Sequence, residues 1–535
     1  MTNRLYYGDN LQVLRDSVQD ESVDLIYLDP PFNSQSSYNV LFKAPTGEQS
    51  KAQIEAFKDT WHWNDHAEND FDDVMKSGNS DVAEMLRAFR SFLKENDMMA
   101  YIAMMAVRLL ELYRALKPTG SLYLHCDPTA SHYLKIILDG VFGTVGFRDD
   151  IVWKRAETVK GNFGQGSKFF DRNTDSILFY AKSSQQKFNP QFREYTQQYV
   201  EDFCKYVEEG TGRIYRLISM TGPGGAAKGN PIYEVMGVKR YWRYSRDKMN
   251  KLIDAGMVVQ TKPGAVPQRK LYLDEGKGVP VQSLWDDIPA LHSQSAERLG
   301  YPTQKPLALL ERIIRSSSNE SDIVLDPFCG CGTTIHAAQK LNRQWLGIDI
   351  THLAISLIER RLKDAFPGID FAVHGTPKDI DGARALAAQD KYQFQWWAVS
   401  LVNAIPFGGK KKGSDGGIDG TIYFKPDGKT TEKAIVSVKG GDNVGVPMIR
   451  DLAHVVDREN AKIGLFITLT EPTKPMQTEA VKAGFYQTPY AKYPKIQILT
   501  IAELFSGQQA NIPLVDPSVF RKAQKESVSE QNKLF

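Results

Sequence analysis

Residues 322–350 constrain the fold of this chain more than any other stretch of its sequence. The stretch runs from the apolar IVL through a glycine-rich turn into IHAAQKL and then QWLGIDI. Two apolar runs that flank a glycine turn and a helical pattern predict a β-α-β unit. Units of this kind are joined by right-handed crossovers and build an open, mostly parallel sheet with helices on both faces.

The N-terminal third of the chain repeats this alternation. VDLIYL at residues 23–28 and SLYLHCD at 121–127 are typical of buried strands, and residues 98–116 and 130–138 have the pattern of helices. We therefore predict an α/β fold with a Rossmann-like, doubly wound sheet for the first part of the chain.

Two breaks in this alternation indicate further domains. Gly, Pro, Tyr and basic residues dominate between 156 and 300, and a separate α/β pattern begins after a break near 374–390. A chain of 535 residues is long enough for several domains. We predict a first domain at 1–155 and 301–375, an insert at 156–300, a linker at 376–393, a second domain at 394–505 and a flexible tail at 506–535.

The net charge of +2 hides a basic region inside the insert. Twelve Lys or Arg residues stand against three acids between Thr211 and Tyr272, in a stretch that also carries four Tyr and one Trp before Tyr272. Cations mixed with aromatic rings suit phosphates and unstacked bases. A solvated basic face, with the aromatic residues turned into a core, explains the same composition. Both interpretations stay open on sequence alone.

Composition excludes several classes of protein. The chain has no run of eighteen apolar residues, and its N-terminus, MTNRLYYGDN, lacks the basic-then-apolar pattern of a signal peptide. The four cysteines are scattered, and the spacing of Cys329 and Cys331 fits no structural zinc site. We expect a cytoplasmic protein without membrane spans or disulfides.

The first candidate for chemistry is Asp29-Pro30-Pro31-Phe32, which follows the predicted strand 23–28. Open α/β sheets place their ligands at the carboxyl ends of strands. Methylation of an exocyclic amine needs acceptors for the N–H groups, and the Asp29 carboxylate and the Pro30 carbonyl supply two. Phe32 can stack on a base that has left the duplex. The motif by itself is weak, because Asp-Pro also marks ordinary turns.

The second candidate is the glycine turn Asp326-Pro327-Phe328-Cys329-Gly330-Cys331-Gly332-Thr333-Thr334. Glycines allow the backbone to approach a ligand at the start of the following helix. Asp349 lies nineteen residues after Gly330, which suits an acid that binds ribose hydroxyls. A glycine turn that serves only helix packing is the alternative interpretation.

In this order the two motifs resemble the β-class amino-methyltransferases of DNA. Ile151-Val152-Trp153-Lys154-Arg155 is similar to the strand that enters that family's target-recognition region. The resemblance covers about residues 1–375 and implies a Rossmann-like methyltransferase fold that binds S-adenosylmethionine. Catalysis is then assigned to Asp29, Pro30, Pro31 and Phe32. Cofactor binding is assigned to Asp9, Thr303, Gln304, Lys305, Asp326, Phe328, Gly330, Gly332, Thr333 and Asp349.

The resemblance implies direct methyl transfer to a flipped base in double-stranded DNA, without a covalent enzyme intermediate. No Pro-Cys dipeptide is present, so the thiol attack of cytosine-C5 methyltransferases has no evident nucleophile. Aspartate at the first motif position favours adenine N6, with cytosine N4 as the alternative. A catalytically inactive DNA-binding scaffold is the alternative of another class. A homodimer is compatible with all three.

The insert is expected to recognise the DNA sequence. Its arginines at positions 240, 243, 246 and 269 can each read guanine or hold a phosphate. Sequence alone does not separate the two roles, so no recognition residue is assigned.

The segment 394–505 resembles the PD-(D/E)xK nuclease fold, in its Mrr-like branch. The matching residues are Asp419, Lys439 in AIVSVKGG, the strand GLFITLT and the helix QFQWWAVSLV. An acid on one strand and a lysine on the next can hold Mg²⁺, with Asp419 as the ligand, and activate water. Ser437 and Gln395 stand where the family often has metal-binding residues. Fewer carboxylates weaken metal binding, so cleavage is in doubt and a DNA-binding domain without cleavage is the alternative.

The last five residues, QNKLF, resemble the short peptides that dock bacterial proteins on the replicative sliding clamp. Gln531, Leu534 and Phe535 are the residues that such docking uses. An ordinary tail is the alternative.

Overall fold

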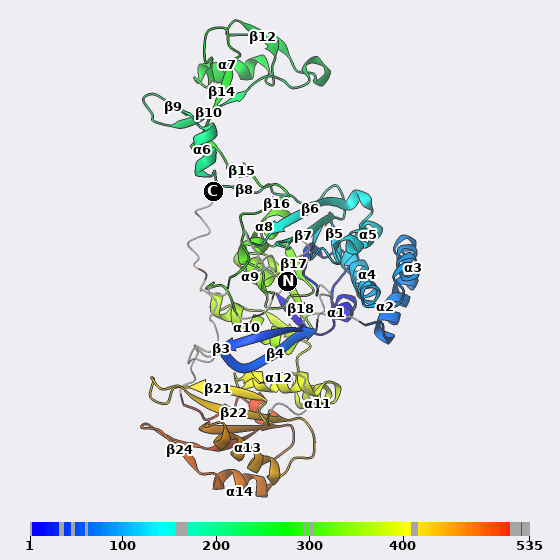
Figure 1. Cartoon of the computed structure of the whole chain (residues 1–535), viewed down its shortest axis with the longest axis vertical. Coiled ribbons are helices and arrows are strands. Elements are labelled where there is room, and N and C mark those ends of the chain that lie inside the picture. Colours follow the sequence, from blue (N-terminus) through cyan, green and yellow to red (C-terminus); the bar gives the residue numbers. More distant parts are fainter. Residues whose placement is uncertain are drawn as a thin grey trace. The chain divides into compact units, whose positions relative to one another are not determined.

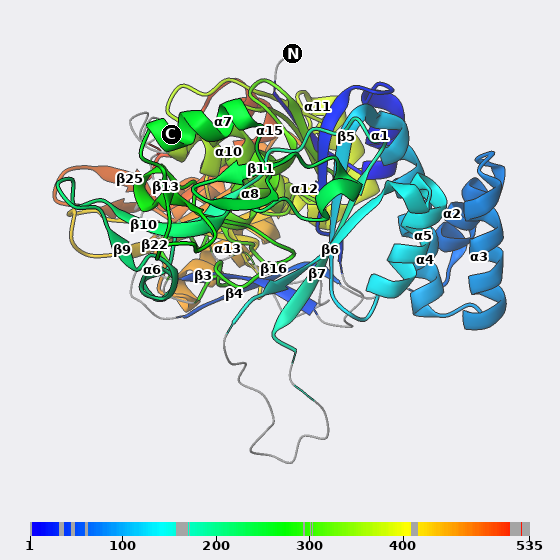
Figure 2. The ribbon, with the colours of Figure 1, turned by 90° about the horizontal axis from the view of Figure 1, so that it is seen from above.

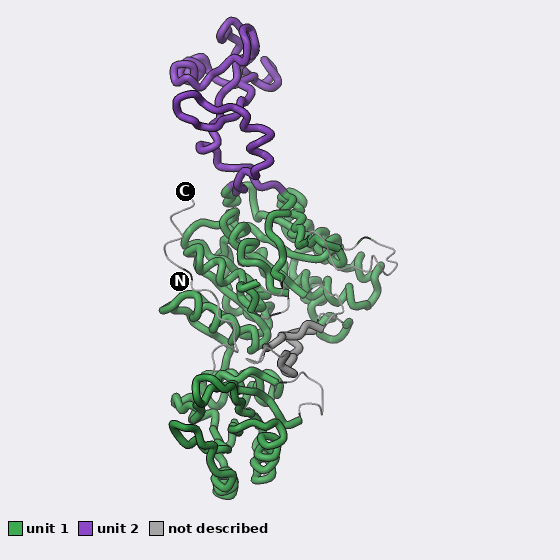
Figure 3. The backbone as a smooth tube through the Cα atoms, turned by 60° about the vertical axis from the view of Figure 1, so that its left-hand side comes forward, with its two compact units in different colours: residues 1–189, 283–535 green, residues 190–282 purple. Residues whose placement is uncertain are grey.

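The computed structural model of the chain forms two compact units, residues 1–189 with 283–535 and residues 190–282 (Figure 3). The structure describes residues 3–31, 37–43, 49–58, 62–156, 170, 172–292, 295–299, 301, 303–407, 416–513 and 526.

A nine-stranded sheet forms the centre of the larger unit (Figure 1). Strand β7 runs antiparallel to β5 and β6, and the other pairs in this sheet are parallel. The predicted α/β sheet is therefore confirmed, with an added antiparallel strand. Its order is β16 (Leu284–Trp285), β6 (Phe147–Lys154), β7 (Thr174–Ala181), β5 (Leu116–Cys126), β2 (Val23–Leu28), β17 (Ile323–Asp326), β18 (Gln344–Asp349), β1 (Arg4–Tyr7) and β19 (Ala372–His374).

Helices cover both faces of this sheet, as the doubly wound pattern predicts. Ile26 and Leu28 of β2 pack in a core with α1, α4 and α5, whereas Tyr123 of β5 bonds Ser317 of α8 on the opposite face. Figure 2 shows α2 to α5 gathered beside strands β5 to β7. The helices are α1 (Asn10–Ser17), α2 (Asp65–Lys76), α3 (Ser80–Leu93), α4 (Asp97–Ala115), α5 (Ser131–Phe142), α8 (Leu307–Ser317), α9 (Thr333–Lys340) and α10 (His352–Ala365). A separate hairpin joins β3 (Ser37–Lys43) to β4 (Gln49–Lys58).

Helix α4 shows why its sequence pattern predicts a helix. The Asn96 side chain accepts from the Met99 N–H and begins the helix, whose residues are apolar on almost every side because α1, α2 and α5 surround it. The helix ends at Ala115, ahead of Pro118, which cannot continue it. No described helix is long and apolar enough to cross a membrane.

The smaller unit has its own core, made of Met220, Tyr233, Val235, Trp242 and Met249. Tyr233 and Trp242 are therefore core residues. For these two rings the structure agrees with a solvated basic face whose aromatic residues turn into a core. The elements are β8 (Phe192–Arg193), α6 (Gln197–Phe203), β9 (Tyr206–Val207), β10 (Ile214–Ser219), β11 (Ile232–Val235), β12 (Val238–Tyr241), α7 (Arg246–Asp254), β13 (Val258–Val259), β14 (Gln268–Tyr272) and β15 (Val279–Pro280).

The C-terminal part of the larger unit is a five-stranded mixed sheet with helices on both faces. Strands β20, β21 and β22 are antiparallel, and β22, β23 and β26 are parallel. The expected linker carries α11 (Ile380–Gln389), and the expected clamp-binding residues lie outside the described residues. The other elements are α12 (Lys391–Leu401), β20 (Ile405–Pro406), β21 (Gly420–Phe424), β22 (Glu432–Lys439), α13 (Val446–Arg458), β23 (Ile463–Thr468), α14 (Lys474–Lys482), β24 (Phe485–Gln487), β25 (Lys492–Pro494), β26 (Ile496–Thr500) and α15 (Ile501–Phe505).

Candidate active site

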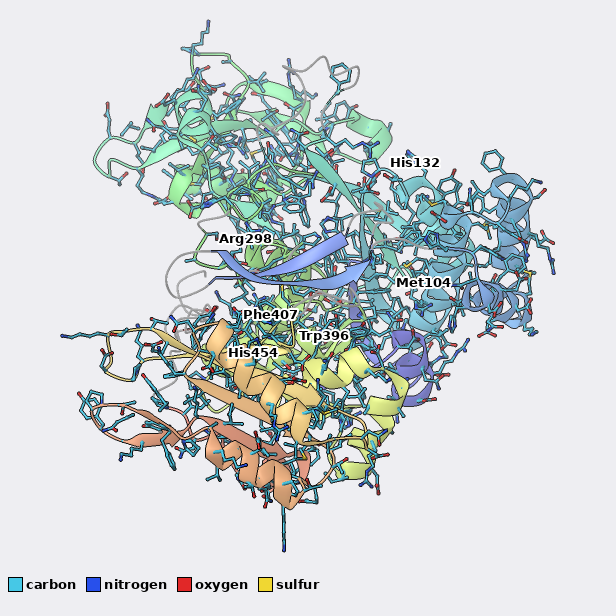
Figure 4. All side chains as sticks on the ribbon, turned by 60° about the horizontal axis from the view of Figure 1, so that its bottom comes forward. Met104, His132, Arg298, Trp396, Phe407 and His454 are labelled. Carbon is cyan, nitrogen blue, oxygen red and sulfur yellow. The ribbon has the colours of Figure 1, made fainter. Side chains whose placement is uncertain are left out.

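A cavity of about 290 Å³ lies at the carboxyl ends of the central parallel strands. Residues that follow β1, β2, β17 and β18 line it, and Met104, labelled on α4 in Figure 4, forms part of its wall. The order of the strands explains this position. Strands β2 and β17 pair directly, so the two predicted motifs meet although the insert separates them in sequence.

The structure places Asp29, Pro30 and Pro31 in the wall of this cavity. Phe32 lies outside the described residues. Lys305 forms an ion pair with the Asp29 carboxylate, and both side chains are largely buried. The oxygens of the Asp29 carboxylate can accept N–H groups.

The glycine turn lines the same cavity through Asp326, Phe328, Gly330 and Thr333. Gly330 has φ +50°, and a Cβ there would come 3.3 Å from the ring of Tyr301. The positive φ and this contact explain why a residue without a side chain stands there.

Gly332 packs against α10, whereas the sequence predicts that it binds the cofactor. Its φ is +73°, and an added Cβ would lie 2.8 Å from Cγ1 of Ile358 on α10. Among the described residues it is not part of the lining. Gly332 therefore allows the turn to pack closely against α10.

Asp349 at the end of β18 holds the turn in place. Its carboxylate accepts from the Gly330 N–H at 2.9 Å and from the backbone N–H and hydroxyl of Thr351, each at 2.9 Å. Burial raises the pKa of Asp349 to about 6 and that of Asp326 to about 7. Two buried carboxylates with raised pKa values favour a cationic or hydrogen-bond-donating ligand.

Asp9 lies at the mouth of the cavity and begins α1. One of its oxygens accepts from the Leu11 N–H at 2.9 Å, and the other accepts from Nη2 of Arg108 at 2.9 Å. Arg108 also donates from Nε to Asn10 at 2.6 Å. Residue type and spacing did not assign Arg108 to the site, although an arginine within the apolar run of α4 is the available signal.

Thr303 and Gln304 both line the cavity. The Gln304 amide donates to the Glu297 carbonyl at 2.9 Å and accepts from the Leu299 N–H at 2.8 Å. Gln304 therefore fixes the preceding loop. Lining residues that the sequence pattern did not assign to catalysis or to cofactor binding include Asn10, Tyr27, Met104, Arg108, Tyr301, Leu310, Thr334, Ile350 and Thr351.

A second candidate site lies in the C-terminal sheet. The buried carboxylate of Asp419 accepts from the Val438 N–H at 2.6 Å and from the side-chain amide of Gln395 on α12. Lys439 ends β22, one residue after Val438. The structure thus brings Asp419 beside Gln395, the helix position singled out from the sequence. The described residues contain no group of three or more His, Cys, Asp or Glu able to hold a metal ion.

Comparison with known proteins assigns the larger part of the chain. Residues 23–360, more than half of the chain, match the model of the N6/N4 DNA methylase family. The chain belongs to this family. Residues 386–504 of the methylase match the model of a restriction endonuclease domain. The predicted combination of a DNA methylase with an Mrr-like domain is confirmed.

The methylase is similar to a subunit of a type III restriction-modification enzyme and to type II methyltransferases. It is 28% identical over 355 residues to the Mod subunit of the type III enzyme StyLTI from Salmonella typhimurium, covering 64% of this chain and 50% of that subunit. It is 27% identical over 368 residues to the type II methyltransferase M.EcaI from Enterobacter cloacae, covering 68% and 69%. Among solved structures, the cytosine-N4-specific PvuII DNA methyltransferase is similar at a TM-score of 0.35 and 12% identity, covering 67% and 86%. The match thus spans half the length of the Mod subunit.

Proposed function

We propose that the methylase transfers a methyl group from S-adenosylmethionine to the exocyclic N6 of adenine in double-stranded DNA. The observation that carries the proposal is that Asp29 and the glycine turn, at the ends of adjacent strands, line one cavity. The cofactor supplies an electrophilic methyl group when it is bound. An acceptor of amine N–H groups and a turn suited to a nucleoside-like ligand then lie within one site.

The residues of the cavity fit such a cofactor. Asp349 and Asp326 offer acceptors to ribose hydroxyls and to an ammonium group, and their charge suits a sulfonium. Gly330 leaves room for a ligand close to the backbone. Asp29 and the Pro30 carbonyl accept from the target amine, and the ion pair with Lys305 holds the Asp29 side chain in place. A base reaches this depth only after it rotates out of the duplex.

Sequence recognition is assigned to the smaller unit. Arg240, Arg243 and Arg246 are exposed there, whereas Arg269 is partly buried. Exposed arginines suit phosphates and guanine edges. Cytosine N4 is the alternative target, because both amines need the same acceptors.

The test is methyl incorporation from labelled S-adenosylmethionine into unmethylated bacterial DNA, followed by nucleoside analysis. N6-methyladenine supports the proposal in full. N4-methylcytosine would keep the mechanism and replace the base, whereas no incorporation into any DNA would favour a binding scaffold.

We expect cofactor binding to strengthen as the pH rises from 5 to 8. The pKa of Asp349 is about 6 and that of Asp326 about 7, and a cationic ligand binds their ionised forms better. The stability of the unliganded protein depends on pH in the opposite direction. A carboxyl whose pKa is raised by folding adds stability below its unfolded value near 3.8, and that stability is lost as the pH rises through 6 to 7.

Calorimetric titration across this pH range measures the first effect, and unfolding without ligand measures the second. In the Asp349→Asn protein the lower of the two binding steps should disappear. Cofactor affinity that stays constant from pH 5 to 8 in the wild type would contradict the assignment of both acids.

A second candidate function is DNA cleavage by the C-terminal domain, favoured by the contact between Asp419 and Gln395. Replacing Gln395 by Glu puts two carboxylates side by side, which repel without a cation and together suit Mg²⁺. We expect the Gln395→Glu protein to melt at a lower temperature without metal and to recover with millimolar Mg²⁺. Thermal unfolding with and without Mg²⁺, with nicking of plasmid DNA, measures this.

Gln393→Glu is the matched control for this experiment. Gln393 lies on the same helix and accepts from the His352 N–H at 3.2 Å, away from Asp419. Its variant should show no recovery with Mg²⁺. An equal response of the two variants to Mg²⁺ would contradict a metal site at Asp419.

A further inference from the structure

A buried chain of hydrogen bonds lies next to the Asp29 motif. It joins Tyr27 of β2, His125 of β5 and Asp175 of β7, whose side chains are almost fully buried. The Tyr27 hydroxyl lies 3.0 Å from Nδ1 of His125, and Nε2 of His125 lies 3.2 Å from the Asp175 carboxylate. The His125 and Trp153 rings pack edge to face, with ring centroids 5.5 Å apart. This packing and both hydrogen bonds hold the imidazole in one orientation.

The direction of each hydrogen bond follows from the charges around the chain. Burial raises the pKa of Asp175, but the hydrogen bond from His125 and the nearby Arg155, whose Nε lies 3.3 Å from Oδ1 of Asp175, outweigh it, so the pKa of Asp175 is lowered. Burial and the nearby Lys305 lower the pKa of His125, whereas Asp29 and Asp175 oppose them, so the ring is neutral near pH 7. An ionised carboxylate only accepts, so His125 donates from Nε2. Its Nδ1 must then accept from the Tyr27 hydroxyl.

The Tyr27 oxygen is left with lone pairs only. Tyr27, near the end of β2, and Asp29, which directly follows that strand, both line the cavity. We propose that the Tyr27 oxygen is a third acceptor for the amine that receives the methyl group, and that His125 and Asp175 are its positioning residues. This inference rests on the proposed function, which supplies the reacting amine.

The charge that develops during transfer explains why the hydroxyl hydrogen must point away. The amine nitrogen bonds the methyl carbon as the carbon–sulfur bond breaks, and the nitrogen becomes positive. Its two N–H groups then donate more strongly to the Asp29 carboxylate and the Pro30 carbonyl, and the Tyr27 oxygen shares one of these hydrogens as a further acceptor. The surplus proton leaves to the Asp29 carboxylate and from there to solvent. A hydroxyl hydrogen that faced the amine would oppose the same charge.

Tyr27→Phe and Asp175→Asn test the proposal. The first removes the oxygen and keeps the ring, and the second allows His125 to take the other tautomer and turn the Tyr27 hydrogen toward the cavity. We expect kcat to fall about 10- to 100-fold in each, which corresponds to one lost hydrogen bond to a charged group. The Kd for S-adenosylmethionine should stay within about twofold of the wild type, because the oxygen serves the amine.

Tyr123→Phe is the matched control. Tyr123 is the direct neighbour of Tyr27 on β5, and its buried hydroxyl bonds Ser317 Oγ at 2.7 Å. It is not one of the described residues that line the cavity. Its variant loses a buried tyrosine hydroxyl on the same sheet face and should keep the kcat of the wild type.

Two results would overturn the inference. One is a Tyr27→Phe protein whose kcat matches that of Tyr123→Phe. The other is nitrogen NMR of ¹⁵N-histidine-labelled protein that finds His125, assigned through His125→Asn, protonated on Nδ1. If the wild type methylates no DNA, the result contradicts both the proposed function and this inference. If the wild type is active and Tyr27→Phe is unaffected, the result contradicts this inference alone.

Discussion

The Asp29→Asn protein is expected to lose methyl transfer by about 10²- to 10³-fold in kcat, as when one preorganised group that stabilises transition-state charge is removed. The substitution keeps the shape of the side chain and removes the charge. An amide also donates, so one of its two atoms would oppose the N–H groups of the target amine. The ion pair between Lys305 and Asp29 would be lost, which adds to the defect because both side chains are largely buried. Methyl incorporation under saturating cofactor measures the effect.

Asp127→Asn controls for this substitution. Asp127 follows β5, the strand next to β2, and its carboxylate accepts from the Thr129 N–H at 3.0 Å in a local turn. The same change of carboxylate to amide there should leave kcat within about twofold. Transfer by Asp29→Asn at the rate of Asp127→Asn would refute the role of Asp29. Cofactor affinity should stay near the wild-type value in both proteins.

The Asp349→Ala protein is expected to bind S-adenosylmethionine about 100-fold more weakly or worse. Two ligand hydrogen bonds to a charged group are lost, each worth about tenfold in affinity. The Gly330 N–H and the Thr351 N–H also lose their acceptor, so the turn loosens and the free energy of unfolding falls by about 1–3 kcal/mol for each group left without a partner. Calorimetric titration and chemical unfolding measure the two effects separately.

Asp24→Ala separates binding from stability. Asp24 is a buried carboxylate on β2, at the opposite end of the strand from the cavity. It accepts from Lys117 at 2.7 Å, Lys187 at 2.9 Å and the Ile323 N–H at 3.0 Å. Its loss should destabilise the fold about as much as Asp349→Ala and leave cofactor affinity unchanged. Equal loss of affinity in both variants would mean that Asp349 acts only through stability.

The main strands and helices of the methylase followed from local pattern, because apolar runs, helix caps and proline stops act within a few residues. The predicted strand at 23–28 coincides with β2, and the predicted helix at 98–116 differs from α4 by one residue at each end. Element boundaries in the insert did not follow, because its strands are short and its core is formed by scattered residues such as Met220 and Trp242. Only the resemblance to the nuclease fold singled out Gln395 and Asp419, and local sequence pattern did not predict their pairing.

The sequence by itself determined which groups carry the chemistry, since the Asp29 motif, the glycine turn and Asp349 are each recognisable from residue type and spacing. Tertiary structure alone decided what surrounds them. Lys305 reaches Asp29, Arg108 reaches Asp9, and Tyr27, His125 and Asp175 join across three strands because the sheet brings distant segments within hydrogen-bond distance. Hydrogen-bond direction, burial and raised pKa values depend on these neighbours, and the linear spacing of residues contains no information on them.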